Sequence, residues 1–269
     1  MRKAEVPMNK RKICISITLV AIFLLLGWEL LGMIGGGISF NDPVAEKSVG
    51  MIVTRGLGSC VFLSIIVYKR YSILNPAKRL GKAVLISLPA ILVVVNNLPI
   101  YPLISGLAWV DAPAVNILLL FAECFAVALF EESCFRGVVQ AGFLEKRRST
   151  KKGQFLSIVL TSAVFGAVHL VNIFMGSSPV AVLMQIGYSF LIGAMCSVVL
   201  FRSANLWLCV MLHAVFNFNG ALVPTLGDGV IWEPFTVTVT AILAVLTTAY
   251  MTVVFFRTKA DALDDIYAK

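Results

Sequence analysis

The stretch LFEESCFRG, residues 129–137, places Glu131, Glu132 and Arg136 inside a long apolar segment. The surrounding residues 114–144 contain only one further charged residue, Glu123. An ionisable group at the centre of a membrane helix costs about 2.5 to 3.5 kcal/mol, so such groups are rare and mark paired or functional positions. This stretch therefore predicts a helix buried in a membrane bundle, with its charges facing inward.

The whole chain has the composition of a membrane protein. Of its 269 residues, 59% are hydrophobic and 13% are charged, whereas soluble domains carry about 25% charged residues. Eight apolar runs approach the ~20 residues that cross a bilayer as a helix: residues 13–34, 51–68, 83–101, 114–144, 154–174, 180–201, 205–223 and 235–256. We expect an all-α fold, a single polytopic membrane domain over residues 1–269 with about eight transmembrane helices. The fourth run is too long for a perpendicular crossing, and we expect it to be tilted, broken or partly on the surface.

Basic residues cluster at alternate ends of these runs, which predicts the topology. The basic clusters are residues 2–12, 69–82, 146–152, Arg202 and residues 257–269. The intervening loops carry acids instead, with one lysine among them: Asp42, Glu46, Lys47, Asp111, Asp228 and Glu233. Because lysine and arginine are retained on the cytoplasmic side, we expect both termini in the cytoplasm. The net charge of +8 then reflects topology and affinity for anionic lipid, and no nucleic-acid partner is expected.

All six cysteines lie in predicted spans, and no two form a C-x-x-C pair. This pattern favours buried small hydrophobic residues over a disulfide framework or a zinc knuckle. The six are Cys14, Cys60, Cys124, Cys134, Cys196 and Cys209.

The chain contains two histidines, and both lie within predicted spans, in FGAVHLVN (165–172) and HAVFN (213–217). Histidine has an ordinary pKa near 6.5, so it can pass protons at neutral pH, and it can also ligate metals. His169 lies four residues after Phe165, and His213 lies four residues before Asn217. Each pair therefore shares one helix face.

Helical spacing also predicts different roles for the two glutamates. Glu132 and Arg136 are four residues apart, with the acid first, so they share a face and can neutralise each other. Glu131 lies ~100° around the helix from Glu132. We therefore expect Glu132 to be held by Arg136 and Glu131 to be available for chemistry.

The three patterns EExxxR, FxxxH and HxxxN occur in this order on three spans, and together they resemble the CPBP intramembrane proteases. This family is also called the CAAX protease and bacteriocin-processing or Abi family, and it includes the Rce1-like prenyl-protein endopeptidases. Gly193 and the run SANLW (203–207) add to the resemblance, with Ser203 and Ala204 where the family commonly has Thr-Gly. The resemblance covers a catalytic core of about residues 114–222.

The resemblance implies an endopeptidase that hydrolyses a peptide bond of a membrane-associated peptide or protein. It implies that Glu131 and His169 activate a water molecule, that His213 and Asn217 stabilise the oxyanion, and that Glu132, Arg136 and Phe165 support them. Ser133 and Cys134 are possible nucleophiles, but neither stands in a nucleophile elbow.

A metal-dependent version uses the same residues. Glu131, His169 and His213 are the ligand types of a catalytic zinc site with an open fourth position. The chain lacks H-E-x-x-H, and the same residues can work without a metal. We expect the metal-free mechanism, with zinc as the alternative cofactor.

Two other functions remain open for a buried cluster of glutamate and histidine. A proton-coupled carrier is one, although the sequence shows no internal repeat of the kind that carriers commonly have. A non-catalytic membrane regulator is the other. For the protease, the possible tasks are cleavage of prenylated CAAX proteins, peptide maturation and bacteriocin self-immunity, and we expect a multi-pass protein of the bacterial plasma membrane.

Overall fold

The computed structural model describes residues 42–75, 80–145, 147–259, 263 and 266. The expected span at residues 13–34 lies outside these residues. The described elements, in chain order, are α2 (Pro43–Tyr68), η1 (Ser72–Leu74), α3 (Leu80–Ile86), α4 (Leu88–Asn96), α5 (Ile100–Ile104), β1 (Ala108–Val110), α6 (Ala114–Glu132), η2 (Ser133–Val139), α7 (Gln140–Glu145), α8 (Lys151–Val168), α9 (Val171–Phe174), α10 (Pro179–Ser203), α11 (Leu206–Leu226), β2 (Gly227–Gly229) and α12 (Pro234–Arg257).

Six helical runs in the described part of the chain are long and apolar enough to cross a membrane. They are Pro43–Tyr68, Ala114–Glu145, Lys151–Phe174, Pro179–Ser203, Leu206–Leu226 and Pro234–Arg257, and they coincide with six of the expected spans. The expectation of one unbroken helix over residues 83–101 is wrong. That segment forms the three short helices α3, α4 and α5, because Pro89 and Pro99 each lack the backbone N–H that a continuous helix needs.

Polar caps mark where the long helices begin. The Asp42 side chain accepts hydrogen bonds from the backbone N–H groups of Val44 (2.9 Å) and Ala45 (3.5 Å) at the start of α2. The Asn205 side chain accepts from the N–H of Leu208 (2.9 Å) and begins α11. Between α10 and α11, Ala204 has a φ of 51°, the left-handed conformation that favours glycine. The family's usual glycine at this position therefore has a backbone reason.

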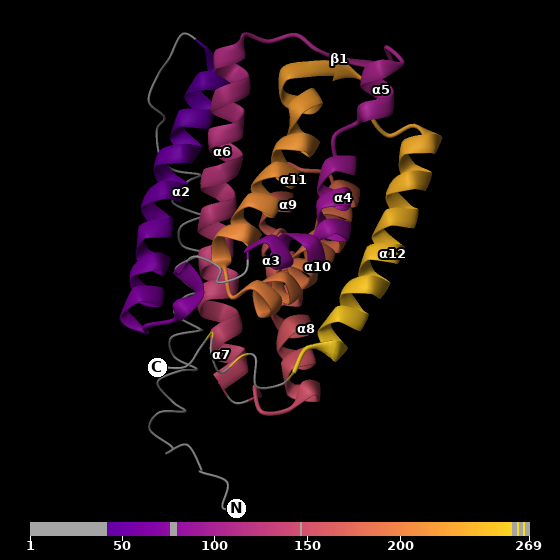
Figure 1. The fold of residues 1–269 in the computed structure, drawn as a ribbon. Coiled ribbons are helices and arrows are strands. Elements are labelled where there is room, and N and C mark those ends of the chain that lie inside the picture. Colours follow the sequence, from indigo (N-terminus) through magenta and orange to yellow (C-terminus); the bar gives the residue numbers. More distant parts are fainter. Residues whose placement is uncertain (1–41, 76–79, 146, 260–262, 264–265, 267–269) are drawn as a thin grey trace, which may run out of the picture.

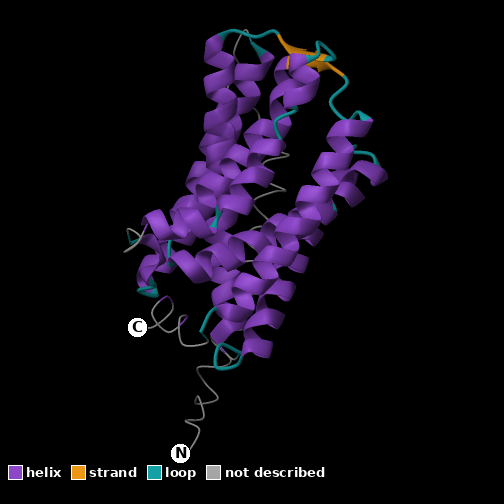
Figure 2. Ribbon diagram, turned by 45° about the vertical axis from the view of Figure 1, so that its right-hand side comes forward, coloured by secondary structure: helices purple, strands orange, loops and turns teal. Residues whose placement is uncertain are grey.

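The helix α6 lies between α2 and α11, and α8 packs along α10 (Figure 1). At one end, β1 and β2 form an antiparallel pair with Trp109 opposite Asp228. This two-stranded sheet is a small exception to the expected all-α fold, and Figure 2 shows it capping a bundle that is otherwise helical. The fold thus places the middle of α6 among neighbours on several sides.

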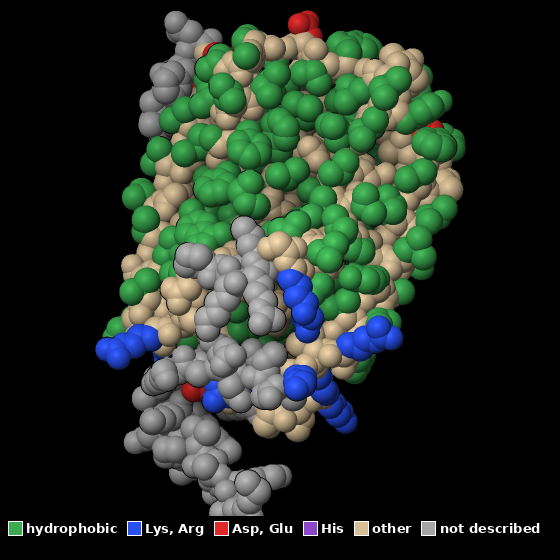
Figure 3. Space-filling model, viewed as in Figure 1, with side chains coloured by type: hydrophobic (Ala, Val, Ile, Leu, Met, Phe, Trp, Pro, Cys, Tyr) green, Lys and Arg blue, Asp and Glu red, His purple; other side chains and the backbone are tan. Residues whose placement is uncertain are grey.

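Charged side chains separate toward the two ends of the bundle. At one end, Lys151 Nζ donates to the Phe255 carbonyl (3.2 Å), and Arg202 and Arg257 lie in the last turns of α10 and α12. At the other end, Asn116 donates to the Asp42 carboxylate (2.8 Å), and this bond holds the pKa of Asp42 below its ordinary value. Figure 3 shows lysine and arginine gathered at one end of a face that is otherwise largely hydrophobic. This separation is the arrangement that the positive-inside rule requires.

The fourth expected span is one continuous helical run, Ala114–Glu145, so it is not broken. Its middle section, η2, is π-helical, and all seven of its residues are buried. A π-helical stretch shifts the side chains that follow it relative to α-helical spacing, and such stretches are frequent at functional sites. Here it follows directly after Glu131 and Glu132, about midway along the run.

Candidate active site

Glu132 lies at the centre of a buried ionic cluster. Its side chain and that of Arg136 are both 0% exposed, and Glu132 Oε1 lies 3.0 Å from Arg136 Nη1. The same oxygen lies 2.8 Å from His213 Nδ1. The structure thus shows the pairing with Arg136 that the spacing predicts, and it adds an imidazole that local spacing could not reveal.

Glu131 faces the other nitrogen of the same imidazole. Its Oε2 lies 3.5 Å from His213 Nε2, and its side chain is 15% exposed while that of His213 is 5% exposed. His213 in α11 is therefore held between two adjacent carboxylates of α6, one at each ring nitrogen. When Nδ1–H donates to Glu132, the tautomer and the direction of Nε2 are fixed.

His169 comes to the same place from α8, of which it is the C-terminal cap. Its ring meets the Phe165 ring edge-on, with centroids 5.6 Å apart. The His213 ring meets the same phenylalanine edge-on at 5.7 Å. Both imidazoles of the chain therefore lie against one buried aromatic ring, and the predicted pairing of Phe165 with His169 is present.

Phe165 also contacts the cation of the cluster. The Arg136 guanidinium lies over its ring, with the central carbon 4.8 Å from the ring centroid, a cation–π contact. Gly193 of α10 makes this packing possible. A Cβ at Gly193 would lie 3.1 Å from Phe165 Cδ1 and 3.3 Å from Arg136 Nη2, so any side chain there would press on both.

The remaining predicted residues differ in burial and in hydrogen bonding. Asn217 is partly buried one turn after His213 in α11, and its side chain has no hydrogen-bond partner among the described residues. Ser133 is buried, and its hydroxyl donates to the Phe130 carbonyl at 3.0 Å. Cys134 is 0% exposed. The hydroxyl of Ser133 thus donates to the backbone, and among the described residues no hydrogen-bonded base is present to activate it as a nucleophile.

Two sets of side chains have the donor types of a metal site. The first is the predicted set, Glu131, His169 and His213. His213 fits this role because a carboxylate holds its Nδ1, which is the outer-shell support that metal-bound histidines commonly have. The second set is Glu132, Cys196 and Cys209, which the sequence did not single out. Among the described residues, this set alone has ligand atoms that all lie within 4.8 Å of one another. Its members come from three helices, so their spacing along the chain gave no signal.

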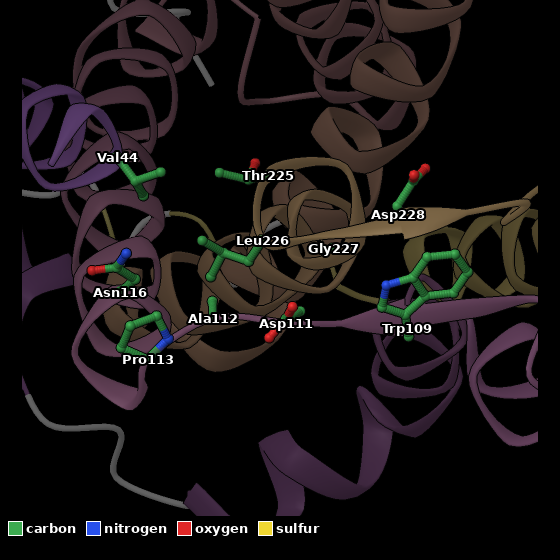
Figure 4. Close-up of a pocket in the computed structure, with 10 residues that line it drawn as sticks. All are labelled: Val44, Trp109, Asp111, Ala112, Pro113, Asn116, Thr225, Leu226, Gly227 and Asp228. Atoms are coloured by element: carbon green, nitrogen blue, oxygen red, sulfur yellow. The ribbon is translucent and has the colours of Figure 1, made fainter.

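A separate pocket lies at the end of the bundle that carries β1 and β2 (Figure 4). It has a volume of about 400 Å³ and contains none of the predicted catalytic residues. The lining residues are Val44, Trp109, Asp111, Ala112, Pro113, Asn116, Thr225, Leu226, Gly227 and Asp228. The two imidazoles therefore belong to a different part of the molecule.

Comparison with known families agrees with the motifs. The model of the Rce1-like type II CAAX prenyl endopeptidases matches residues 113–219, which run from the N-terminal cap of α6 into α11 and enclose Glu131, His169 and His213. No curated protein and no solved structure matches the chain. The protein is therefore a multi-pass integral membrane protein, and its residues 113–219 are similar to the Rce1-like type II CAAX prenyl endopeptidases.

Proposed function

We propose that this protein is an intramembrane endopeptidase that uses Glu131 and His169 to activate water. The observation that carries the proposal is the position of His213 between two carboxylates, with Glu131 at Nε2 and Glu132 at Nδ1. Hydrolysis of a peptide bond needs a base for water and donors for the oxyanion. The cluster contains side chains of both kinds on one buried surface.

Glu131 is the general base of this proposal. Its side chain is partly exposed, whereas that of Glu132 has no exposed surface. The Glu131 carboxylate takes one proton from water as the water oxygen attacks the peptide carbonyl carbon. It then returns that proton to the leaving amine as the C–N bond breaks. His169, whose ring packs against the same Phe165 as that of His213, orients the same water molecule in this proposal.

Asn217 and His213 stabilise the charge that develops on the carbonyl oxygen, and His213 does so when both ring nitrogens carry protons, so that Nδ1 donates to Glu132 and Nε2 donates to the oxyanion. An oxyanion donor must be held in place before the reaction, and one such donor contributes about 10²- to 10³-fold to the rate. Glu132 fixes the His213 ring through Nδ1, and Arg136 neutralises Glu132. These two residues are positioning residues that act through His213.

Zinc is the alternative cofactor, and Glu131, His169 and His213 have the donor types for it, but these three would have to move closer together, because they are not among the described groups whose ligand atoms lie within 4.8 Å of one another. Glu131, His169 and His213 would hold the ion, which would supply a Lewis acid and a more acidic bound water. Glu132 and Arg136 would keep their role, because they orient His213 in either case. Rescue of a chelated sample by zinc would favour this version over the metal-free one.

The substrate that fits is a peptide or protein embedded in or attached to the bilayer. The cluster lies about midway along the Ala114–Glu145 run, so a scissile bond must come to membrane depth. Cleavage of prenylated CAAX proteins follows from the family description, and peptide maturation or bacteriocin self-immunity suits a bacterial plasma-membrane protein. The basic end of the bundle would face the cytoplasm.

Proteomics of membrane fractions tests the proposal. We expect cells with the native chain to contain cleaved peptides that cells with Glu131→Gln or His169→Ala lack, at equal protein levels. An unchanged peptide set would contradict the protease. A phenotype that survives both substitutions would indicate a regulator, and loss of proton-coupled uptake without any change in peptides would indicate a carrier.

A further inference from the structure

A second cluster lies behind the ionic pair of Glu132 and Arg136. One ligand atom each of Glu132, Cys196 and Cys209 lies within 4.8 Å of the other two. In a tetrahedral zinc site the metal–sulfur distance is ~2.3 Å, which places ligand atoms about 3.5 to 3.8 Å apart. The three side chains therefore need to close by at most about 1 Å to enclose one ion.

The cluster is held by three helices and is sealed from solvent. Glu132 comes from α6, Cys196 from α10 and Cys209 from α11, and each of the three is 0% exposed. Cys209 Sγ donates to the Cys196 carbonyl at 3.2 Å, which ties α10 to α11 at this point. The cluster is thus part of the buried interior.

One acceptor in this cluster is unused. Glu132 Oε1 serves both Arg136 and His213, but Oε2 is buried and has no hydrogen-bond partner among the described residues. A buried carboxylate oxygen without a donor costs free energy. A cation would satisfy it.

The charges balance both with and without an ion. Without one, the Glu132 carboxylate and the Arg136 guanidinium cancel, and both thiols are neutral. When a divalent cation binds, both thiols lose their protons to solvent, and three anions then face the ion and Arg136. The net charge of this group is zero in both states. A buried site without water requires this, because an unpaired buried charge is costly.

We propose that Glu132, Cys196 and Cys209 form a binding site for one thiophilic divalent cation of the zinc and cadmium kind. Two thiolates and a carboxylate select such an ion over magnesium or calcium. This site is distinct from the predicted set of Glu131, His169 and His213. A bound ion would be coordinated by the Glu132 carboxylate, which also positions His213. If the protein is the proposed protease, the ion is therefore an inhibitor.

Cadmium titration of the reduced protein in detergent tests the site. We expect an ultraviolet thiolate-to-cadmium charge-transfer band that saturates at one ion per chain, with release of two protons. Cys196→Ala and Cys209→Ala each lose the band, and Cys134→Ala, equally buried in η2, keeps it. If an alanine variant does not fold, Cys→Ser at the same position, which nearly keeps the volume, replaces it.

A chain that keeps only Cys196 and Cys209 gives the converse test. It retains the band at one ion per chain if the site is real. Absence of the band from this chain, or its persistence in both single alanine variants, overturns the proposal. Inhibition is measured in each variant as the ratio of the cleavage rate with cadmium to the rate without it. If no preparation cleaves peptide at all, the protease proposal is contradicted, but the charge-transfer band still tests the metal site.

Discussion

Two buried carboxylates on α6 have very different surroundings. Glu123 is 9% exposed and accepts a hydrogen bond of 2.7 Å from the Ser48 hydroxyl of α2. Glu132, nine residues further along, meets a guanidinium and an imidazole. Both regions therefore contain a buried acid. They differ in its partners, which are a neutral hydroxyl for Glu123 and two ionisable side chains for Glu132. In the described part of the chain, the second region adds imidazoles to its carboxylates, and an imidazole can exchange a proton at neutral pH.

The largest effect should come from Glu131→Gln. We expect the rate of peptide cleavage to fall by about 10²- to 10⁴-fold, because amide oxygen cannot serve as the general base. Glu123→Gln is the matched control on the same helix and should leave the rate within a few-fold. Steady-state kinetics on a peptide identified by proteomics measures both. Equal losses in the two variants would remove the distinction between the regions.

Arg136→Leu should be the most destabilising of the substitutions considered. It leaves the Glu132 carboxylate buried without its cation, and breaking a buried pair in this way costs ~3 to 5 kcal/mol. Ser48→Ala removes only a neutral donor from Glu123 and should cost about 1 to 3 kcal/mol. Unfolding of the purified variants in detergent compares the two. If Arg136→Leu is as stable as the parent, the pairing with Glu132 is wrong.

A smaller effect is expected where α10 meets the cluster. Gly193→Ala pushes a Cβ against Phe165 and Arg136, and overpacking of this kind costs about 1 to 3 kcal/mol. Gly187→Ala in the same helix is the matched control, since a Cβ there meets no described atom within 4 Å. The control should be neutral or slightly stabilising. Equal melting temperatures for both variants would contradict the close packing at Gly193.

The smallest effect should come from Ala204→Gly in the link that joins α10 to α11, the helix that carries His213. Ala204 has a φ of 51°, and glycine adopts this conformation without steric cost. We expect a gain of about 0.5 to 1 kcal/mol, visible as a small rise in Tm. A loss of stability would show that the left-handed conformation is absent from the folded protein.

The sequence predicted what local spacing controls. The i,i+4 rule correctly paired Glu132 with Arg136 and Phe165 with His169, and apolar length located six spans. The prolines within residues 83–101 indicated that the helix there is interrupted, but the apolar composition of the segment favoured a single span. The two-stranded sheet had no signal of comparable strength, because its strands have three residues each.

Contacts between distant segments could not be predicted in this way. Glu132 and His213 are 81 residues apart, and their meeting depends on how α6 and α11 pack. The π-helical section that follows Glu132 also changes the spacing on which a helical projection relies. Of the described cysteines, Cys124, Cys134, Cys196 and Cys209 are buried as expected, whereas Cys60 is exposed. The approach of Cys196 and Cys209 to Glu132 depends on the same packing.

Nitrogen-15 NMR of histidine-labelled protein tests the central claim most directly, because the chain contains only two histidines and His169→Gln assigns the signals. The structure predicts that Glu132→Gln shifts the Nδ1 resonance of His213, whereas Glu131→Gln shifts its Nε2 resonance and Glu123→Gln shifts neither. If neither substitution in the motif changes the His213 signals, the imidazole does not lie between the two carboxylates, and the proposed catalytic site is contradicted.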